Sequence, residues 1–217
     1  HDLCRRQRQM CIRDSRYSEE EKEVFQKMWD NVTLVKDEKG AMRVKVNYLY
    51  KSDPNVIFSP QNTNYNQALM MTKKVILQLK KKGQLEMFQK EIQKKIDIGT
   101  LVAMNDDEVE ETMKSTHHFT LLAMVMSETS SSTSTRLINN TKTRVPGQGT
   151  SYCLENNMIK CNIGDSFDSL LDFRLYDNPY SSDISKCYLR ILVDDLTAKL
   201  RLLVWFDNPQ DMTGIKI

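Results

Sequence analysis

The chain has few cysteines and no long hydrophobic run, and both features limit the classes of protein to which it can belong. Of five cysteines among 217 residues, three lie beyond residue 14: Cys153, Cys161 and Cys187. Their number is odd and no C-x-x-C spacing occurs, which argues against a disulfide framework and against a zinc site. No apolar run approaches the roughly 18 residues of a membrane-spanning helix, and the N-terminus has no signal-peptide pattern. We therefore expect a cytoplasmic protein without membrane association.

Residues 1–14 carry an excess of positive charge that we expect to be foreign to the protein. The run RRQRQMCIRD at residues 5–14 matches one translated frame of a common sequencing-library adapter, so we exclude residues 1–14 from fold prediction. A natural basic tail is the alternative. Without these residues, 27 basic and 27 acidic residues remain of the 31 and 29 in the whole chain. The overall charge therefore gives no support for nucleic-acid binding.

Residues 15–63 predict an N-terminal extension made of a helix, a hairpin and a loop. Ser18 followed by Glu21 is the capping-box pattern, and apolar residues then recur at helical spacing up to residue 29. Two strands, Val32–Val35 and Met42–Leu49, flank a charged turn that contains a glycine. Residues 51–63 hold two prolines with several Asn and Ser, which predicts a loop.

Residues 64–98 have the most regular pattern of the chain. Two helical apolar faces, at 64–82 and 85–98, are closed by Gly83 and Gly99 and predict a helical hairpin. Between residues 73 and 95 its surface holds eight lysines against two glutamates. These lysines are candidates for contacts with a nucleic-acid backbone, chiefly Lys73, Lys80, Lys81 and Lys82. A solvated helix face is the alternative, because no aromatic residues interleave with the lysines.

The middle of the chain predicts two strands separated by a polar loop. His117 and His118 are adjacent, so on an extended segment their side chains point to opposite sides and do not easily share a metal. Apolar residues 119–126 predict a strand, the polar run at 127–135 a loop, and residues 136–138 a second strand. Further on, a helix is expected from Asp165 to Pro179, then strands at 180–184 and 200–206.

Asp183 and Tyr188 form the most informative pair, at the end of the strand at 180–184. A carboxylate on an apolar strand can hold Mg²⁺ against a triphosphate, and an aromatic ring five residues later can form the floor under a sugar. This pattern suits nucleotidyl transfer. The alternative is a half-buried strand end with a capping aspartate.

Taken in order, these motifs resemble the front of a reverse transcriptase from an LTR retrotransposon of the BEL/Pao type. The similarity runs from about Tyr17 to about Phe206 and rests on the order of five short motifs: YSEEEKEVFQKMW with MRVKVNYLY, the His117-His118 pair, SSSTSTRLINNTKT, LLDFRL at residues 170–175, and DISKCY at residues 183–188. The resemblance implies an α+β fold in which residues 64–217 form the fingers and first palm strand of a right-hand polymerase.

The resemblance also implies roles for three residues. Asp183 resembles the first catalytic aspartate, a ligand of both divalent metals, Mg²⁺ or Mn²⁺. Arg136 resembles the fingers arginine that contacts the incoming triphosphate, and Tyr188 the aromatic gate that favours deoxynucleotides. Template-primer and dNTP are then the ligands. Protease, RNase H and integrase modules of one polyprotein would be its partners, within a cytoplasmic virus-like particle.

A second carboxylate pair, on a Y-x-D-D hairpin, is needed to complete such a two-metal site. The stretch Val193-Asp194-Asp195-Leu196 begins only ten residues after Asp183, and residues 184–193 contain no Gly or Pro for the tight reversal that would bring the carboxylates together. We expect Asp194 and Asp195 to be the polar start of a turn or helix, and the chain by itself to be catalytically inactive.

Two other functions remain open. One is a non-enzymatic module in which the lysine-rich hairpin binds nucleic acid or an acidic partner, and the other is a decayed transposon relic.

Overall fold

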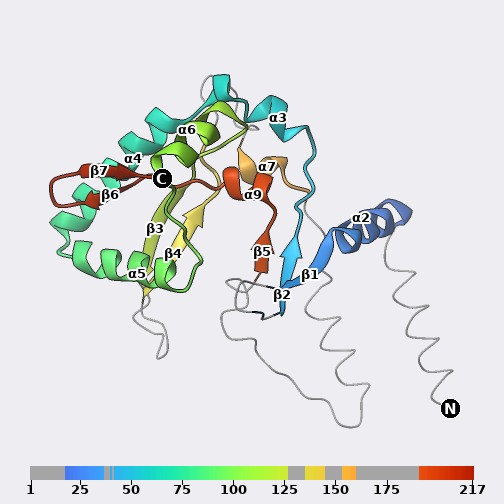
Figure 1. Cartoon of the computed structure of the whole chain (residues 1–217), viewed down its shortest axis with the longest axis horizontal. Coiled ribbons are helices and arrows are strands. Elements are labelled where there is room, and N and C mark those ends of the chain that lie inside the picture. Colours follow the sequence, from blue (N-terminus) through green and yellow to red (C-terminus); the bar gives the residue numbers. More distant parts are fainter. Residues whose placement is uncertain (1–17, 37–39, 41, 127–134, 145–152, 160–190) are drawn as a thin grey trace, which may run out of the picture. The chain divides into compact units, whose positions relative to one another are not determined.

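The computed structural model describes residues 18–36, 40, 42–126, 135–144, 153–159 and 191–217. Helices and small sheets combine in these residues, so the chain is of the predicted α+β class (Figure 1). It divides into two compact units, one of residues His1–Leu49 and Ile159–Leu192, the other of residues Tyr50–Met158 and Val193–Ile217. None of the helices in the described residues is long and apolar enough to cross a membrane.

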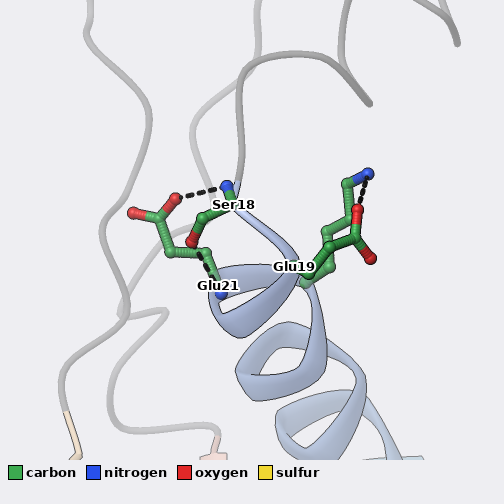
Figure 2. Close-up of polar contacts among 4 residues, drawn as sticks. Ser18, Glu19 and Glu21 are labelled. Carbon is green, nitrogen blue, oxygen red and sulfur yellow. Dashed lines mark hydrogen bonds and ion pairs between the residues drawn. The ribbon is translucent and has the colours of Figure 1, made fainter.

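The first unit begins with helix α2 (Glu19–Asp30), whose start follows from its sequence. The Ser18 hydroxyl accepts a hydrogen bond from the Glu21 backbone N–H at 3.2 Å, and the Ser18 N–H donates to the Glu21 carboxylate at 2.9 Å. Figure 2 shows this reciprocal pair, which satisfies two backbone donors that the first helical turn leaves unpaired. The predicted capping box is therefore confirmed.

Strands β1 (Val32–Lys36) and β2 (Met42–Val46) pair antiparallel, with Val32 opposite Val46, which confirms the predicted hairpin. The predicted turn between them falls largely outside the described residues. Gly40 has φ +77°, a left-handed conformation that glycine adopts without steric cost. Strand β5 (Ile191–Val193) extends the sheet beside β2 in the order β1-β2-β5.

The second unit is built on the predicted helical hairpin, α4 (Tyr65–Lys81) and α5 (Leu85–Asp97). Gly83 and Gly99 follow the two helices with φ of +63° and +70°, as expected of glycines that end helices. The buried positions recur at helical spacing on both helices: Ala68, Thr72, Ile76 and Leu79 on α4, and Leu85, Phe88 and Ile92 on α5. Ile96 continues the apolar spacing of α5 but is 39% exposed, near the end of the helix.

Residues 51–63 were predicted as a loop, and this prediction is wrong in part. They contain a short helix, α3 (Pro54–Ile57), and a 3₁₀ turn, η1 (Pro60–Asn62). Each begins with a proline, which lacks an N–H that the first helical turn would leave unpaired. The prolines therefore start helical turns here. The acidic run from Asp106 also starts a helix, α6 (Asp106–Lys114), behind a capping box of Asn105 and Glu108.

Strands β3 (Leu121–Met126) and β4 (Thr135–Asn140) confirm the two predicted strands, and the structure shows that they pair antiparallel. They lie against the helical hairpin, β3 contacting α4 and β4 contacting α5 (Figure 1). A short helix, α7 (Leu154–Asn157), follows. The C-terminal part forms α9 (Asp195–Lys199) and a hairpin of β6 (Trp205–Asn208) and β7 (Thr213–Lys216).

The strand predicted at 200–206 is placed wrongly, because Leu200 caps α9 and only Trp205 and Phe206 belong to β6. The apolar residues of this stretch pack into three separate clusters instead of along one strand. Leu200 packs with Phe58 and Leu154, and Val204 with Ala68 and Phe119. Phe206 joins the core between α4 and α5, formed by Ile76, Leu79, Leu85, Phe88 and Ile92.

Candidate functional site

The structure gives the place of one of the three residues predicted to act on metal and nucleotide. Arg136 lies in β4 opposite Val125, one pair from the 127–134 connection between β3 and β4. Asp183 and Tyr188 lie outside the described residues, as do the helix predicted from Asp165 and the strand predicted at 180–184. The part of the site that lies within the described residues is therefore the β3–β4 hairpin and the residues that hold its base.

The chain enters β3 through residues 117–120, which are held by backbone hydrogen bonds to distant segments. His118 N–H donates to the Lys199 carbonyl at the end of α9 at 3.0 Å. Phe119 forms a parallel bridge with Leu202, flanked by bonds from Thr120 N–H to the Leu202 carbonyl (2.8 Å) and from Leu202 N–H to the His118 carbonyl (3.1 Å). The C-terminal segment thus fixes the start of the hairpin.

Asn64 ties the same stretch to α4. Its side-chain amide donates to the Phe119 carbonyl at 2.8 Å and its side-chain oxygen accepts from the Phe119 N–H at 2.9 Å. Asn64 occupies the N-cap position of α4 but makes no side-chain cap bond, because the amide is engaged by Phe119. Asn64 is 1% exposed, so both bonds lie where water does not compete for them.

The His117 ring is buried, and both of its nitrogens have hydrogen-bond partners. Nδ1 lies 2.8 Å from the Ser115 carbonyl oxygen, which can only accept, so Nδ1 carries the hydrogen. Nε2 lies 2.8 Å from the Thr63 hydroxyl oxygen. The ring also meets Phe119 edge-on, with centroids 5.7 Å apart.

The His118 ring is hydrogen-bonded through Nε2. Its Nε2 lies 3.1 Å from the Thr143 carbonyl oxygen and therefore carries the hydrogen. The Thr143 hydroxyl donates to the Phe119 carbonyl at 2.8 Å, and the Phe58 ring lies 4.8 Å from the imidazole centroid. Burial lowers the pKa of His118 to about 4. The hydrogen bond to Thr143 raises this pKa, and the neighbouring His117 makes a smaller contribution that lowers it. The imidazole is neutral at physiological pH.

These residues form what we call the hairpin anchor: Thr63, Asn64, His117, His118, Phe119 and Thr143. The two rings contact different partners, as their adjacency in an extended segment predicts, and His117 Nε2 is hydrogen-bonded to Thr63. The anchor is thus arranged to position backbone. Within the described ranges no group of three or more His, Cys, Asp and Glu side chains is placed to bind a metal ion.

The sequence singled out the two histidines as a pair but not as an anchor, and it did not single out Thr63, Asn64 or Thr143. Asn64 could have been noticed because it precedes a segment with helical apolar periodicity, but an asparagine at that place indicates a helix cap and not a bond to a distant strand. The bond to Phe119 spans 55 residues of sequence and has no local pattern.

Asp194 and Asp195 stand at the start of α9, which confirms the prediction made for them. Asp194 is the N-cap in an extended conformation (φ −68°, ψ 163°), and Asp195 is the first residue of the helix.

The lysines predicted to contact nucleic acid differ in their surroundings. Lys73, Lys81 and Lys82 are exposed. Lys80 is half-buried, and its ammonium donates to the Gln210 carbonyl in the turn between β6 and β7. The Lys80 ammonium therefore helps to hold the C-terminal hairpin against α4, unlike the other three.

Three comparisons with known proteins complete the description of the site. The chain matches no protein-family model, no curated protein and no solved structure. A functional assignment therefore rests on the residues themselves.

Proposed function

We propose that the chain forms the fingers and the first palm strand of an RNA-directed DNA polymerase of the BEL/Pao retrotransposon type. The observation that carries the proposal is the β3–β4 hairpin. Its base is fixed by the buried hairpin anchor, and Arg136 lies in β4 next to the connection between the strands. A rigid strand pair with an arginine near its free end suits the binding of a triphosphate, because guanidinium can contact phosphate oxygens in a bidentate way.

In this proposal Arg136 binds the triphosphate of the incoming dNTP, and Tyr188 lies under its sugar and disfavours a 2′-hydroxyl. Asp183 would hold Mg²⁺ or Mn²⁺, and its carboxylate is the hard oxygen ligand that such ions prefer. When bound, two metal ions stabilise the attacking and leaving oxygens of nucleotidyl transfer. Since Asp194 and Asp195 begin α9, the second carboxylate pair would come from a different segment.

Two experiments test the polymerase function. The first is to sequence the source locus through both ends of the chain. A reading frame that continues into a Y-x-D-D hairpin supports the polymerase, and an authentic stop after Ile217 favours a relic or a binding module. The second is primer extension with the protein expressed from that frame. Asp183→Asn should abolish extension and leave template binding nearly intact, while Asp172→Asn, a matched change nearby, should leave extension in place. Extension that persists in Asp183→Asn contradicts the metal-ligand role.

The second candidate function is a module that binds nucleic acid without catalysis. It is favoured by the surface of α4, whose charge is not neutralised within the helix. It predicts binding without primer extension in any form of the protein, so the same extension assay separates the two functions.

A further inference from the structure

Five residues of α4 form a continuous outward surface that we call the lysine face: Met70, Lys73, Lys74, Leu77 and Lys81. At 3.6 residues per turn they fall within an arc of about 100°, and all five are exposed. The opposite side of α4 is buried at Ala68, Thr72, Ile76 and Leu79. The core thus fixes the orientation of the helix, and the lysine face is held toward solvent.

The lysine face is not neutralised by its own helix. In α2 the Lys27 ammonium lies 2.7 Å from the Glu23 carboxylate, and in α6 Lys114 pairs with Glu110 in the same i, i+4 arrangement. Helix α4 contains no acidic residue at all. Among the described residues, none forms an ion pair or a hydrogen bond with the ammonium groups of the lysine face. Their charge is therefore available to an external anion.

The helix dipole explains only part of this pattern. Lysines in the last turn, such as Lys81, are favoured by the negative end of the dipole, but the effect falls off within one turn. Lys73 and Lys74 lie about two turns earlier, in the middle of the helix. Lys74 and Lys81 are separated by about 10 Å along the helix axis, close to the axial rise of about three nucleotides in one strand of duplex DNA.

We propose that the lysine face binds the phosphate backbone of nucleic acid without regard to base sequence. An acidic protein is a weaker fit, because a stable interface buries about 800 Å² on each partner, whereas only Met70 and Leu77, 55% and 48% exposed, offer apolar contact. The lysine face holds no aromatic side chain on which bases could stack, so backbone contacts dominate. This inference rests on the second candidate function and deepens it by naming the residues and the backbone contact, and it needs neither metal nor Asp183.

The test is binding of a short fluorescent DNA duplex of mixed sequence to the full chain, measured by anisotropy over a salt series. The triple variant Lys73→Gln/Lys74→Gln/Lys81→Gln should bind at least about tenfold more weakly at low salt. The slope of the logarithm of its binding constant against the logarithm of the salt concentration should be shallower by about 2.7, because each of the three lost phosphate contacts contributes about 0.9 to that slope. Replacing the same lysines by arginine should preserve binding.

The matched control is Arg5→Gln/Arg6→Gln/Arg8→Gln, which removes the same charge from residues 1–14 and should leave affinity unchanged. Equal affinity of the lysine variant and the original chain would overturn the proposal. A loss of affinity seen only in the Arg5→Gln/Arg6→Gln/Arg8→Gln control would overturn it as well. Binding to polyglutamate in preference to the duplex would assign the surface to an acidic protein instead. Primer extension is measured separately from duplex binding, so a failure of the lysine face is distinct from a failure of the polymerase function.

Discussion

The hairpin anchor and the lysine face use polar side chains in opposite ways. In the anchor, the Asn64 amide and the Thr143 hydroxyl are bonded to backbone groups of distant segments, and both residues are buried. On the lysine face, charged groups are exposed and unpaired within the described part of the chain. Buried polar groups are costly when unpaired, so the anchor is expected to determine stability. Exposed charges contribute little to stability, so the lysine face is expected to determine binding.

The largest effect on stability should come from Asn64→Ala. The change removes two hydrogen bonds and leaves the Phe119 N–H buried without its partner, which should lower the free energy of unfolding by about 2–4 kcal/mol. Urea denaturation measures this. Asn66→Ala, an exposed asparagine on the same helix, is the control and should change the free energy by less than about 0.5 kcal/mol. Equal effects at the two positions would remove the distinction between the anchor and the surface.

Acid should weaken the anchor through His118. The unfolded chain takes up a proton at the usual imidazole pKa of 6.5, whereas the folded chain takes it up only near pH 4. The unfolded state therefore binds more protons in this interval, and the stability contributed by neutral His118 is lost as pH falls from about 6.5 toward 4. Between pH 7.5 and 4.5 the loss should be about 2–3 kcal/mol.

The variant that isolates this effect is His118→Gln, which keeps a side-chain donor but does not titrate. Its free energy of unfolding, measured at the two pH values, should change with pH by about 2–3 kcal/mol less than that of the original chain. The same pH dependence in both proteins would show that His118 is not the titrating group.

The smallest effect on stability should come from the lysine face. Replacing Lys73, Lys74 and Lys81 by glutamine removes no pairing interaction and reduces like-charge repulsion along α4, so the free energy of unfolding should change by less than about 0.5 kcal/mol. Urea denaturation of the variant used for nucleic-acid binding provides the measurement. A loss of more than about 1.5 kcal/mol would make the face structural and would remove the contrast with the anchor.

Local patterns in the sequence were sufficient for several elements of the fold. The Ser18–Glu21 capping box lies within four consecutive residues, and its geometry is complete within them. The apolar periodicity of residues 64–98 predicted the α4–α5 hairpin, because a helix buries positions three and four residues apart. Asp194 and Asp195 were placed correctly at the start of a helix for a similarly local reason.

The errors arose where local patterns had more than one solution. The apolar stretch at residues 200–206 suits a strand, but a short apolar run does not distinguish a strand from the buried end of a helix. Pro54 and Pro60 indicate loops in most contexts, and here they begin helical turns. Tertiary packing decided both cases.

By itself the sequence determined α2, α4 and α5, the β1–β2 hairpin and the excess of lysine on α4, because each depends on residues close together in the chain. Only the tertiary structure decided which polar residues are internal and which face solvent. It pairs Asn64 with Phe119 and directs Lys80 to Gln210, contacts that span 55 and 130 residues. Such contacts depend on how whole elements pack, and they separate the lysines available to a partner from the lysine that holds the fold.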